Sequence, residues 1–309
     1  MSTSVCVVGA SGFIGSAIVA ELEKQQKHDI YRYSTTQQQF LDRSPKAHQQ
    51  IDCMIFCAGI HEKSQINSKS LIEDSVELVD SISPLMKRCS KLIFFSSFKT
   101  CFNKRTSTVS AENHYDLESS DSDYGVAKWR AERRVIEICE AAHIPFIILC
   151  PSHVIGPNDF RPSPNGSNFH QSMTAKIHWI PKCYVGLVDI RNIAAFTVRT
   201  IYNNLTNEKI LLNDACLEYE EYVKLICDRE KPIFVILPTV VFSTLEYLMS
   251  GAKILINNPL INLVYFRSHY IRVAYKIPVT QYDRIYTFHQ TINDTQCFFR
   301  KKEMLTGEP

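Results

Sequence analysis

The chain has 309 residues, which is the length of one large domain or of a domain with a subdomain. Apolar residues make up 45% and charged residues 21%, so the chain can bury an ordinary core. The formal net charge of +2 gives no bulk electrostatic reason to expect a nucleic-acid partner.

Eleven cysteines are spread along the chain, and none of them forms a CxxC pair. This pattern is typical of reduced core thiols in a cytosolic protein and offers no ligand cluster for zinc. The N-terminus runs straight into a glycine-rich stretch without a signal peptide, so we expect a cytoplasmic protein. The apolar run 233–249 contains Pro238 and Glu246 and is shorter than the ~20 residues of a membrane span. We expect it to contact a partner or a membrane surface without crossing the bilayer.

The first half of the chain alternates short apolar runs with longer amphipathic ones. The apolar runs predict strands at 4–10, 29–33, 39–42, 52–59, 91–97 and 145–151. The amphipathic runs predict helices at 15–26, 71–89 and 124–142. Strands that alternate with helices indicate βαβ crossovers, so we expect an α/β fold with a Rossmann-type, doubly wound parallel sheet.

The stretch VVGASGFIGSAI places Gly9, Gly12 and Gly15 between the first predicted strand and the first predicted helix. In this spacing Gly9 permits a tight turn, Gly12 lets the backbone approach a pyrophosphate, and Gly15 lets the helix pack closely on the strand. The N-terminus of the helix then offers free N–H groups to the phosphates. The chain is therefore predicted to bind a dinucleotide.

The region after Pro151 has a different composition. Residues 156–168 are rich in Pro, Gly and Asn and are predicted to form a loop. We therefore expect a dinucleotide-binding domain over residues 1–155 and a mostly substrate-binding subdomain over residues 156–309. Within the second part, residues from about 183 to 202 are expected to return to the sheet of the first domain.

The end of the second predicted strand favours NADP as the dinucleotide, with NAD as the alternative. NAD enzymes usually place an acidic residue there, about 20 residues after the glycine turn, to bind the adenosine ribose. Here Tyr33 occupies that place and Arg32 precedes it. A guanidinium at this position can pair with the 2′-phosphate of NADP. Asp42, a little further along, is a candidate for contact with the adenine edge.

Short motifs along the first two thirds of the chain carry a resemblance to a known family. They are GASGFIG (9–15), CAG (57–59), FFSS (94–97), YGVAK (124–128), CPSHVIGP (150–157) and VDIRNIA (188–194). In order and spacing they resemble the extended short-chain dehydrogenase/reductases, the NAD-dependent epimerase/dehydratase group. Beyond Glu218 the resemblance is thin.

The resemblance implies catalytic roles for Ser97, Tyr124 and Lys128. The residues support the same chemistry independently, because a four-residue offset puts Tyr124 and Lys128 on one helix face. A nearby ammonium favours the phenolate and lowers a tyrosine pKa that is normally about 10. Tyr124 can then move a proton near neutral pH, Lys128 can also hold the nicotinamide ribose, and Ser97 can hydrogen-bond the reacting oxygen. Ser96 is the alternative serine, and we expect it to be structural.

The resemblance also implies two sets of binding residues. In addition to the residues named above, those expected at the cofactor are Ser11, Phe13, Ile14, Cys57, Ala58, Gly59, Pro151 and His153, together with Tyr124 and Lys128. Those expected at the substrate are Lys99, His153, His170, His178 and Arg191. Basic side chains that could bind a sugar-nucleotide diphosphate are Arg161, Lys176, Lys182 and Arg191.

The residues after Ser97 discriminate among subfamilies. Sugar-nucleotide 4,6-dehydratases have Asp and Glu in the next two positions, where this chain has Phe98 and Lys99. Without that acid–base pair we expect no 4,6-dehydration. A GDP-fucose-synthase-like enzyme would have a cysteine in place of Lys99, which weakens the case for C3/C5 epimerisation.

The sequence therefore predicts an NAD(P)-dependent oxidoreductase that acts on a nucleotide-activated sugar by 4-keto reduction or 4-epimerisation. Surface-polysaccharide biosynthesis is the setting that the resemblance implies. The first alternative is a reductase or dehydrogenase of a hydrophobic alcohol or ketone, such as a steroid or flavonol. The second alternative is a non-catalytic NADP-binding sensor protein. Relatives dimerise through a helix pair that includes the one bearing Tyr124, so a homodimer is compatible with the resemblance.

Overall fold

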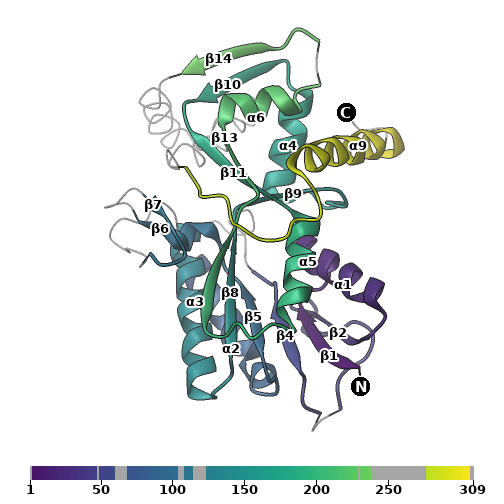
Figure 1. Cartoon of the computed structure of the whole chain (residues 1–309), viewed down its shortest axis with the longest axis vertical. Coiled ribbons are helices and arrows are strands. Elements are labelled where there is room, and N and C mark those ends of the chain that lie inside the picture. The colour runs from purple at the N-terminus through teal and green to yellow at the C-terminus, as the bar shows by residue number, and fades with distance from the viewer. Residues whose placement is uncertain are drawn as a thin grey trace. The chain divides into compact units, whose positions relative to one another are not determined.

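The computed structural model describes residues 2–46, 49–59, 68–103, 108–113, 123–228, 230–237 and 276–306. The chain divides into two compact units, which are coloured by residue number in Figure 1. Unit 1 comprises Met1–Ser152, Ile190–Leu212 and Thr280–Ile285. Unit 2 comprises His153–Asp189, Asn213–Val279 and Tyr286–Pro309.

Unit 1 is built on a seven-stranded sheet with the strand order β12-β8-β5-β4-β1-β2-β3. Its strands are β1 (Thr3–Val8), β2 (His28–Ser34), β3 (Gln39–Phe40), β4 (Cys53–Phe56), β5 (Leu92–Phe95), β8 (Phe146–Pro151) and β12 (Glu208–Leu212). All neighbours are parallel except β3, which runs antiparallel to β2. The central strands β1, β4, β5 and β8 are almost wholly buried, as expected when helices cover both faces of a parallel sheet. The predicted Rossmann-type α/β fold is confirmed.

Two pairs of helices cover this sheet. The helix α1 (Phe13–Gln25) packs with α5 (Ile190–Thr200), and α2 (Ser68–Met86) packs with α3 (Asp123–Ala141). Figure 1 shows the two pairs on opposite sides of the strands. The buried face of α1 is formed by Ile18, Val19 and Leu22, which follow the helical period read from the sequence.

The short 3-10 helix η2 (Phe98–Cys101) follows β5 directly in unit 1. A two-stranded ribbon of β6 (Phe102–Asn103) and β7 (Thr108–Val109) comes next. The end of β5 therefore turns at once into a tight helical segment, and this turn contains Ser97.

Within its described residues, unit 2 combines two small sheets with three helices. One sheet contains β13 (Ala215–Glu218), β11 (Tyr184–Asp189) and β9 (His153–Ile155), and the other pairs β10 (Ile177–Pro181) with β14 (Ile233–Leu237). The helices are α4 (Pro164–Thr174), α6 (Tyr219–Ile226) and α9 (Phe288–Thr306). Aromatic side chains fill the core between them, among them the fully buried Phe169, Tyr219 and Phe299.

The segment predicted to return to the sheet of the first domain, residues 183–202, is divided between the units. Strand β11 pairs with β9 and β13 in unit 2, so residues 184–189 do not join the large sheet. The returning strand is β12, which lies beside β8 with Lys209 opposite Ile148. The sequence EKILL of β12 is short and begins with two charged residues, which is why apolar periodicity did not identify it.

The cysteines are all free thiols, and most of them are buried. Across the described ranges, no group of His, Cys, Asp or Glu side chains is arranged to hold a metal ion. None of the helices within those same ranges is both long and apolar enough to cross a membrane. Of the apolar run 233–249, residues 233–237 form β14, and the remainder lies outside the described residues.

Candidate functional site

The glycine turn after β1 has a geometry that requires glycine. Gly9 has a φ of +83°, and a Cβ there would lie 2.8 Å from the backbone nitrogen of Ala58. A Cβ on Gly15 would lie 2.2 Å from the carbonyl oxygen of Gly9, so only glycine lets α1 approach the turn this closely. The turn is closed by the Gly12 amide, which donates to the Gly9 carbonyl at 3.0 Å.

The N-terminus of α1 is suited to a pyrophosphate. Gly12 is the N-cap, and no side chain caps the helix, so the first N–H groups can donate to an anion. Ser11 is exposed beside the turn, and Phe13 and Ile14 begin the helix with half-buried side chains. The residues present therefore fit a dinucleotide at the position that the sequence predicts.

A pocket of about 240 Å³ opens beside the end of β2. The carbonyl of Tyr33 accepts a hydrogen bond from the Gly9 amide at 2.9 Å, so this strand end lies next to the glycine turn. The residues that line the pocket come from the strand end and from α2; they are Tyr33, Thr35, Gln38, Asp74, Glu77, Leu78, Ser81 and Ile82. Its place beside the turn and its size suit the adenosine half of a dinucleotide. Apart from Tyr33, these residues were not identified from the sequence, because most of them lie on a distant helix.

Arg32 is held by two carboxylates. Its guanidinium pairs with Glu23, and its Nε lies 3.3 Å from Oδ2 of Asp42. Glu23 lies near the C-terminal end of α1, which at 1.5 Å per residue is roughly 16 Å along the axis from Gly12. The guanidinium is therefore compensated by two negative charges and is held away from the helix N-terminus. Asp42, expected at the adenine edge, is placed in this ion pair.

Ser97 stands where β5 passes into η2. It is buried and forms the N-cap of η2, and its Oγ accepts a hydrogen bond from the Lys99 amide at 3.3 Å. Phe98 is buried and Lys99 half-buried. Ser96 points to a different partner, since its Oγ donates to Oε2 of Glu132 at 2.6 Å. That contact is the kind expected for a structural serine.

The helix α3 places Lys128 on the end of β5. Tyr124 and Lys128 lie one turn apart on α3, and Lys128 Nζ donates to the Phe95 carbonyl at 3.2 Å. A Cβ on Gly59 would lie 2.8 Å from the same Nζ, so the amine also contacts the turn after β4. The structure thus brings Lys128 together with the predicted cofactor turn at Gly59 and with the segment that leads to Ser97.

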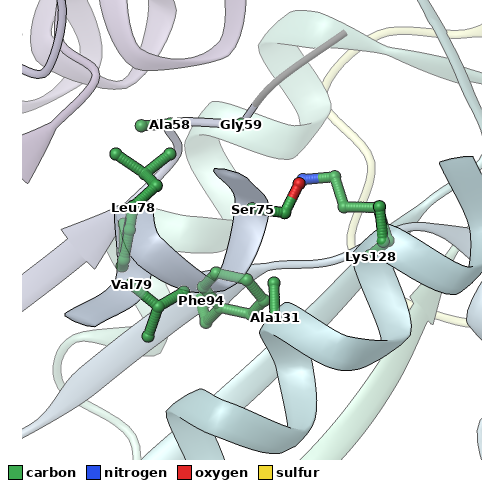
Figure 2. A pocket seen from close by; sticks show the side chains of 10 residues that line it. Ala58, Gly59, Ser75, Leu78, Val79, Phe94, Lys128 and Ala131 are labelled. Carbon is green, nitrogen blue, oxygen red and sulfur yellow. The ribbon is translucent and has the colours of Figure 1, made fainter. Parts of the chain in front are cut away.

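Burial lowers the pKa of Lys128 to about 8, although the charge of Glu132 opposes this shift. Figure 2 shows the amine of Lys128 and the hydroxyl of Ser75 as the polar side-chain groups in an otherwise apolar pocket. The free volume of this pocket is about 10 Å³, close to what one water molecule needs. The half-buried amine of Lys128 therefore lies against a pocket with room for about one water molecule.

Cys57 and Ala58 continue the turn that ends at Gly59. The Cys57 amide donates to the Val8 carbonyl at 2.9 Å, so this turn lies beside the start of the glycine turn. Burial raises the pKa of the Cys57 thiol far above its usual range. Cys57 is thus neutral near physiological pH and gives the site no thiolate. Pro151 ends β8 in the same unit.

The histidines predicted at the substrate all lie in unit 2 and are engaged there. His153 Nδ1 lies 2.8 Å from the Gly186 carbonyl, and His170 Nε2 lies 2.5 Å from Oε1 of Glu303. His178 is fully buried and lies 3.3 Å from the Cys227 sulfur. Among the basic candidates, Arg161, Lys176 and Lys182 are exposed in unit 2, whereas Arg191 lies in α5 of unit 1.

Two charged residues near the predicted catalytic turn were not identified from the sequence. The buried Glu132 forms an ion pair with the half-buried Lys209, whose Nζ lies 2.7 Å from Oε1 of Glu132. Glu132 continues the four-residue spacing of Tyr124 and Lys128 along α3, and that spacing is the signal that could have singled it out.

Comparison with solved structures identifies enzymes of the same fold. A nucleoside-diphosphate-sugar epimerase from Pseudomonas aeruginosa matches with a TM-score of 0.72 and 13% identity, covering 98% of this chain and 99% of that one. The UDP-N-acetylglucosamine 4-epimerase from Bacillus cereus matches with a TM-score of 0.66 and 14% identity, covering 97% of each chain. The UDP-glucuronic acid 4-epimerase from Bacillus cereus, solved in complex with NAD, matches with a TM-score of 0.67 and 15% identity, covering 97% of this chain and 99% of that one.

At these identities the structures show a shared fold and leave the reaction open. No curated protein matches the sequence significantly. The sequence profile described as the NAD dependent epimerase/dehydratase family matches residues 5–186, which is more than half of the chain. On this match, and on the glycine turn and the helix bearing Tyr124 and Lys128, the chain belongs to the NAD-dependent epimerase/dehydratase family.

Proposed function

We propose that this chain is a nicotinamide-dinucleotide-dependent oxidoreductase that acts on a nucleotide-activated sugar by 4-keto reduction or 4-epimerisation. The observation that carries the proposal is the contact between Lys128 Nζ and the Phe95 carbonyl. Through this contact, the Lys128 ammonium lies at the end of the strand that continues into Ser97. Lys128 itself follows Tyr124 by one turn of α3.

Each of the three residues has a distinct role in this proposal. The ammonium of Lys128 favours the phenolate form of Tyr124, which gives or takes the proton at the sugar oxygen. The hydroxyl of Ser97 hydrogen-bonds the same oxygen and orients it. The bound dinucleotide supplies the carbon centre that accepts or returns a hydride.

The nucleotide sugar is proposed from the relatives, several of which are epimerases of such substrates by name. The exposed cations Arg161, Lys176 and Lys182 in unit 2 are the proposed partners of the diphosphate. The departures at Phe98 and Lys99 exclude 4,6-dehydration from the proposal, because no carboxylate follows Ser97.

A hydrophobic alcohol or ketone is the second candidate substrate. It is favoured by the apolar surface of β14, where Ile233 and Ile236 are 50% and 44% exposed. A thermal-shift screen with reduced dinucleotide present separates the candidates. Stabilisation by nucleotide sugars supports the first proposal, and stabilisation by steroids or flavonols alone supports the second. Binding of dinucleotide without turnover of either class supports a non-catalytic sensor.

We expect Tyr124→Phe to lower turnover by about 10²-fold or more while leaving dinucleotide affinity nearly unchanged. The phenol proton is lost, whereas the ring and the helix are kept, and general acid–base groups typically contribute at least this much. Steady-state kinetics and dinucleotide titration measure the two quantities. Unchanged turnover would remove Tyr124 from the mechanism.

The purified enzyme should not convert a nucleoside-diphosphate hexose to its 4-keto-6-deoxy product. Elimination needs an acid and a base beside the sugar, and the two positions after Ser97 hold Phe98 and Lys99. Mass spectrometry of the products detects loss of water directly. Appearance of the dehydrated sugar would contradict both the reaction subclass and the role given to this turn.

Dinucleotide binding should be coupled to proton uptake near pH 8. Lys128 has a pKa of about 8, so its ammonium is present below this pH and is lost as the pH rises through it. A bound anionic dinucleotide favours the ammonium and raises that pKa. Calorimetry at pH 8 in buffers of different ionisation enthalpy measures the uptake, which should be small at pH 6.5. The uptake should vanish in Lys128→Met; an unchanged uptake in that variant would assign the proton to another group.

The finer proposal for the cofactor is a modest preference for NADPH over NADH. A charge-assisted bond to the 2′-phosphate is worth about 1.5–3 kcal/mol, but Arg32 must first leave two carboxylate partners worth up to about 1 kcal/mol each at an exposed site. We expect a preference of about tenfold or less, abolished in Arg32→Ala and increased in Asp42→Asn. Competitive binding measures it.

Arg43→Ala is the matched control for this prediction, because Arg43 is a neighbouring exposed arginine that pairs with Asp29 instead. It should leave the preference unchanged. If NADH binds the unmutated protein as tightly as NADPH, Arg32 does not read the 2′-phosphate and the NADP assignment falls.

A further inference from the structure

A buried carboxylate lies beneath the turn that carries Ser97. The side chain of Glu132 is 5% exposed and that of its partner Lys209 is 19% exposed. A carboxylate this deeply buried is tolerated only where several donors satisfy it. The identity of those donors indicates what the residue does beyond stabilising the fold.

The donors to Glu132 come from both sides of Ser97. Oε2 accepts from the Ser96 hydroxyl at 2.6 Å and lies 2.9 Å from the Thr100 hydroxyl, while Oε1 accepts from Lys209 Nζ at 2.7 Å. Lys209 Nζ also donates to the Thr100 carbonyl at 3.1 Å. The residue before Ser97 and the end of the 3-10 turn that Ser97 begins are thus fixed to one carboxylate.

The Thr100 hydroxyl has a single proton and several acceptors within reach, the nearest two at equal distance. It lies 2.9 Å both from Oε2 of Glu132 and from the Ser97 carbonyl, and the Thr100 amide donates to that carbonyl at 3.0 Å. When the hydroxyl donates to Oε2, the Thr100 amide still holds the Ser97 carbonyl, so Thr100 joins Glu132 to the backbone of Ser97. Ser96 and Thr100 also approach each other at 3.2 Å, so the cluster is continuous.

The same helix holds this turn at a third point. Glu132 follows Lys128 by four residues on α3, and Lys128 donates to the Phe95 carbonyl at 3.2 Å. Side chains of α3 therefore contact Phe95, Ser96 and Thr100 in the segment 95–100. Ser97 lies between these contact points. The position of the serine hydroxyl relative to the helix is set by these contacts.

We propose that Glu132 is a positioning residue, which through Ser96 and Thr100 holds the Ser97 turn in register with Tyr124 and Lys128. The inference rests on the proposed function for its catalytic consequence, but the order of the turn can be measured without any turnover. Lys209 neutralises the carboxylate and joins β12 to the same cluster, so β12 contributes to positioning as well as to the sheet.

The test uses Glu132→Gln and the double variant Glu132→Met/Lys209→Met. Methionine is chosen for the double variant because the amide oxygen of a glutamine could still accept from Ser96 and Thr100. The single variant leaves the Lys209 ammonium without its carboxylate and should unfold at a clearly lower denaturant concentration. The double variant removes both charges while keeping the aliphatic stem of the lysine, so most of the stability should return. A residue with only a structural role would then regain its full activity.

A positioning role predicts a different result for the double variant. We expect kcat to remain at least tenfold below that of the unmutated protein, with dinucleotide affinity and substrate KM changed by less than about threefold. Amide hydrogen exchange in residues 97–101 should accelerate at least tenfold, while exchange in β4 stays the same. Recovery of kcat, or unchanged exchange in the turn, would overturn the proposal.

Lys91→Met is the matched control, because Lys91 lies just before β5, at the end of the strand opposite to Ser97. Its Nζ donates to the carbonyls of Thr200 and Asn203 at 2.7 and 2.8 Å. The variant should lose stability without a change in kcat or in the exchange of the 97–101 turn. If the unmutated protein turns over no nucleotide sugar, the proposed function fails, and the exchange result alone then decides whether Glu132 positions the turn.

Discussion

The contact between the Lys128 amine and the Phe95 carbonyl ties the site to the fold. A parallel sheet ends in a row of carbonyl groups at its carboxyl edge. Here Lys128 of helix α3 donates a hydrogen bond to one of these carbonyls, that of Phe95. Because Gly59 has no side chain, the same amine also fits against the turn after β4. Two strand ends and one helix are thereby fixed around a single nitrogen. The residues proposed to do chemistry lie on that helix and directly after β5.

Much of the fold was predictable because burial on both faces leaves long apolar runs that the sequence shows directly. The strands β1, β4, β5 and β8 are such runs. The glycine turn was predictable because a side chain at Gly9 or Gly15 would collide with the neighbouring backbone. The strand β12 was missed because its pairing with β8 decides its conformation, and its five residues carry too little pattern. Tertiary pairing outweighed local signal there.

The site was less predictable than the fold, because side-chain partners come from elements distant in sequence. Arg32 is expected to bind a phosphate, and no local motif indicated that its guanidinium would pair with Glu23 in the preceding helix. His170 pairs with Glu303, a residue 133 positions away that no local motif connects to it. Glu132 could have been identified only from its four-residue spacing after Lys128 on the predicted helix. Positions on a strand or helix can be read from periodicity, whereas the choice of partner among several charges depends on the packed structure.

The apolar pocket beside Lys128 has a consequence for how the protein responds to its ionic surroundings. Salt at 0.1 M screens exposed charges over a Debye length of about 10 Å. The half-buried Lys128 amine lies against a cavity of about 10 Å³, which is too small for a hydrated ion, so salt screens it less. Arg32, by contrast, is 34% exposed and lies among exposed carboxylates. The two ends of a bound dinucleotide would therefore respond differently to salt, which weakens a contact at Arg32 more than a contact at Lys128. The dependence of dinucleotide affinity on ionic strength thus distinguishes binding of the adenosine end from binding of the nicotinamide end.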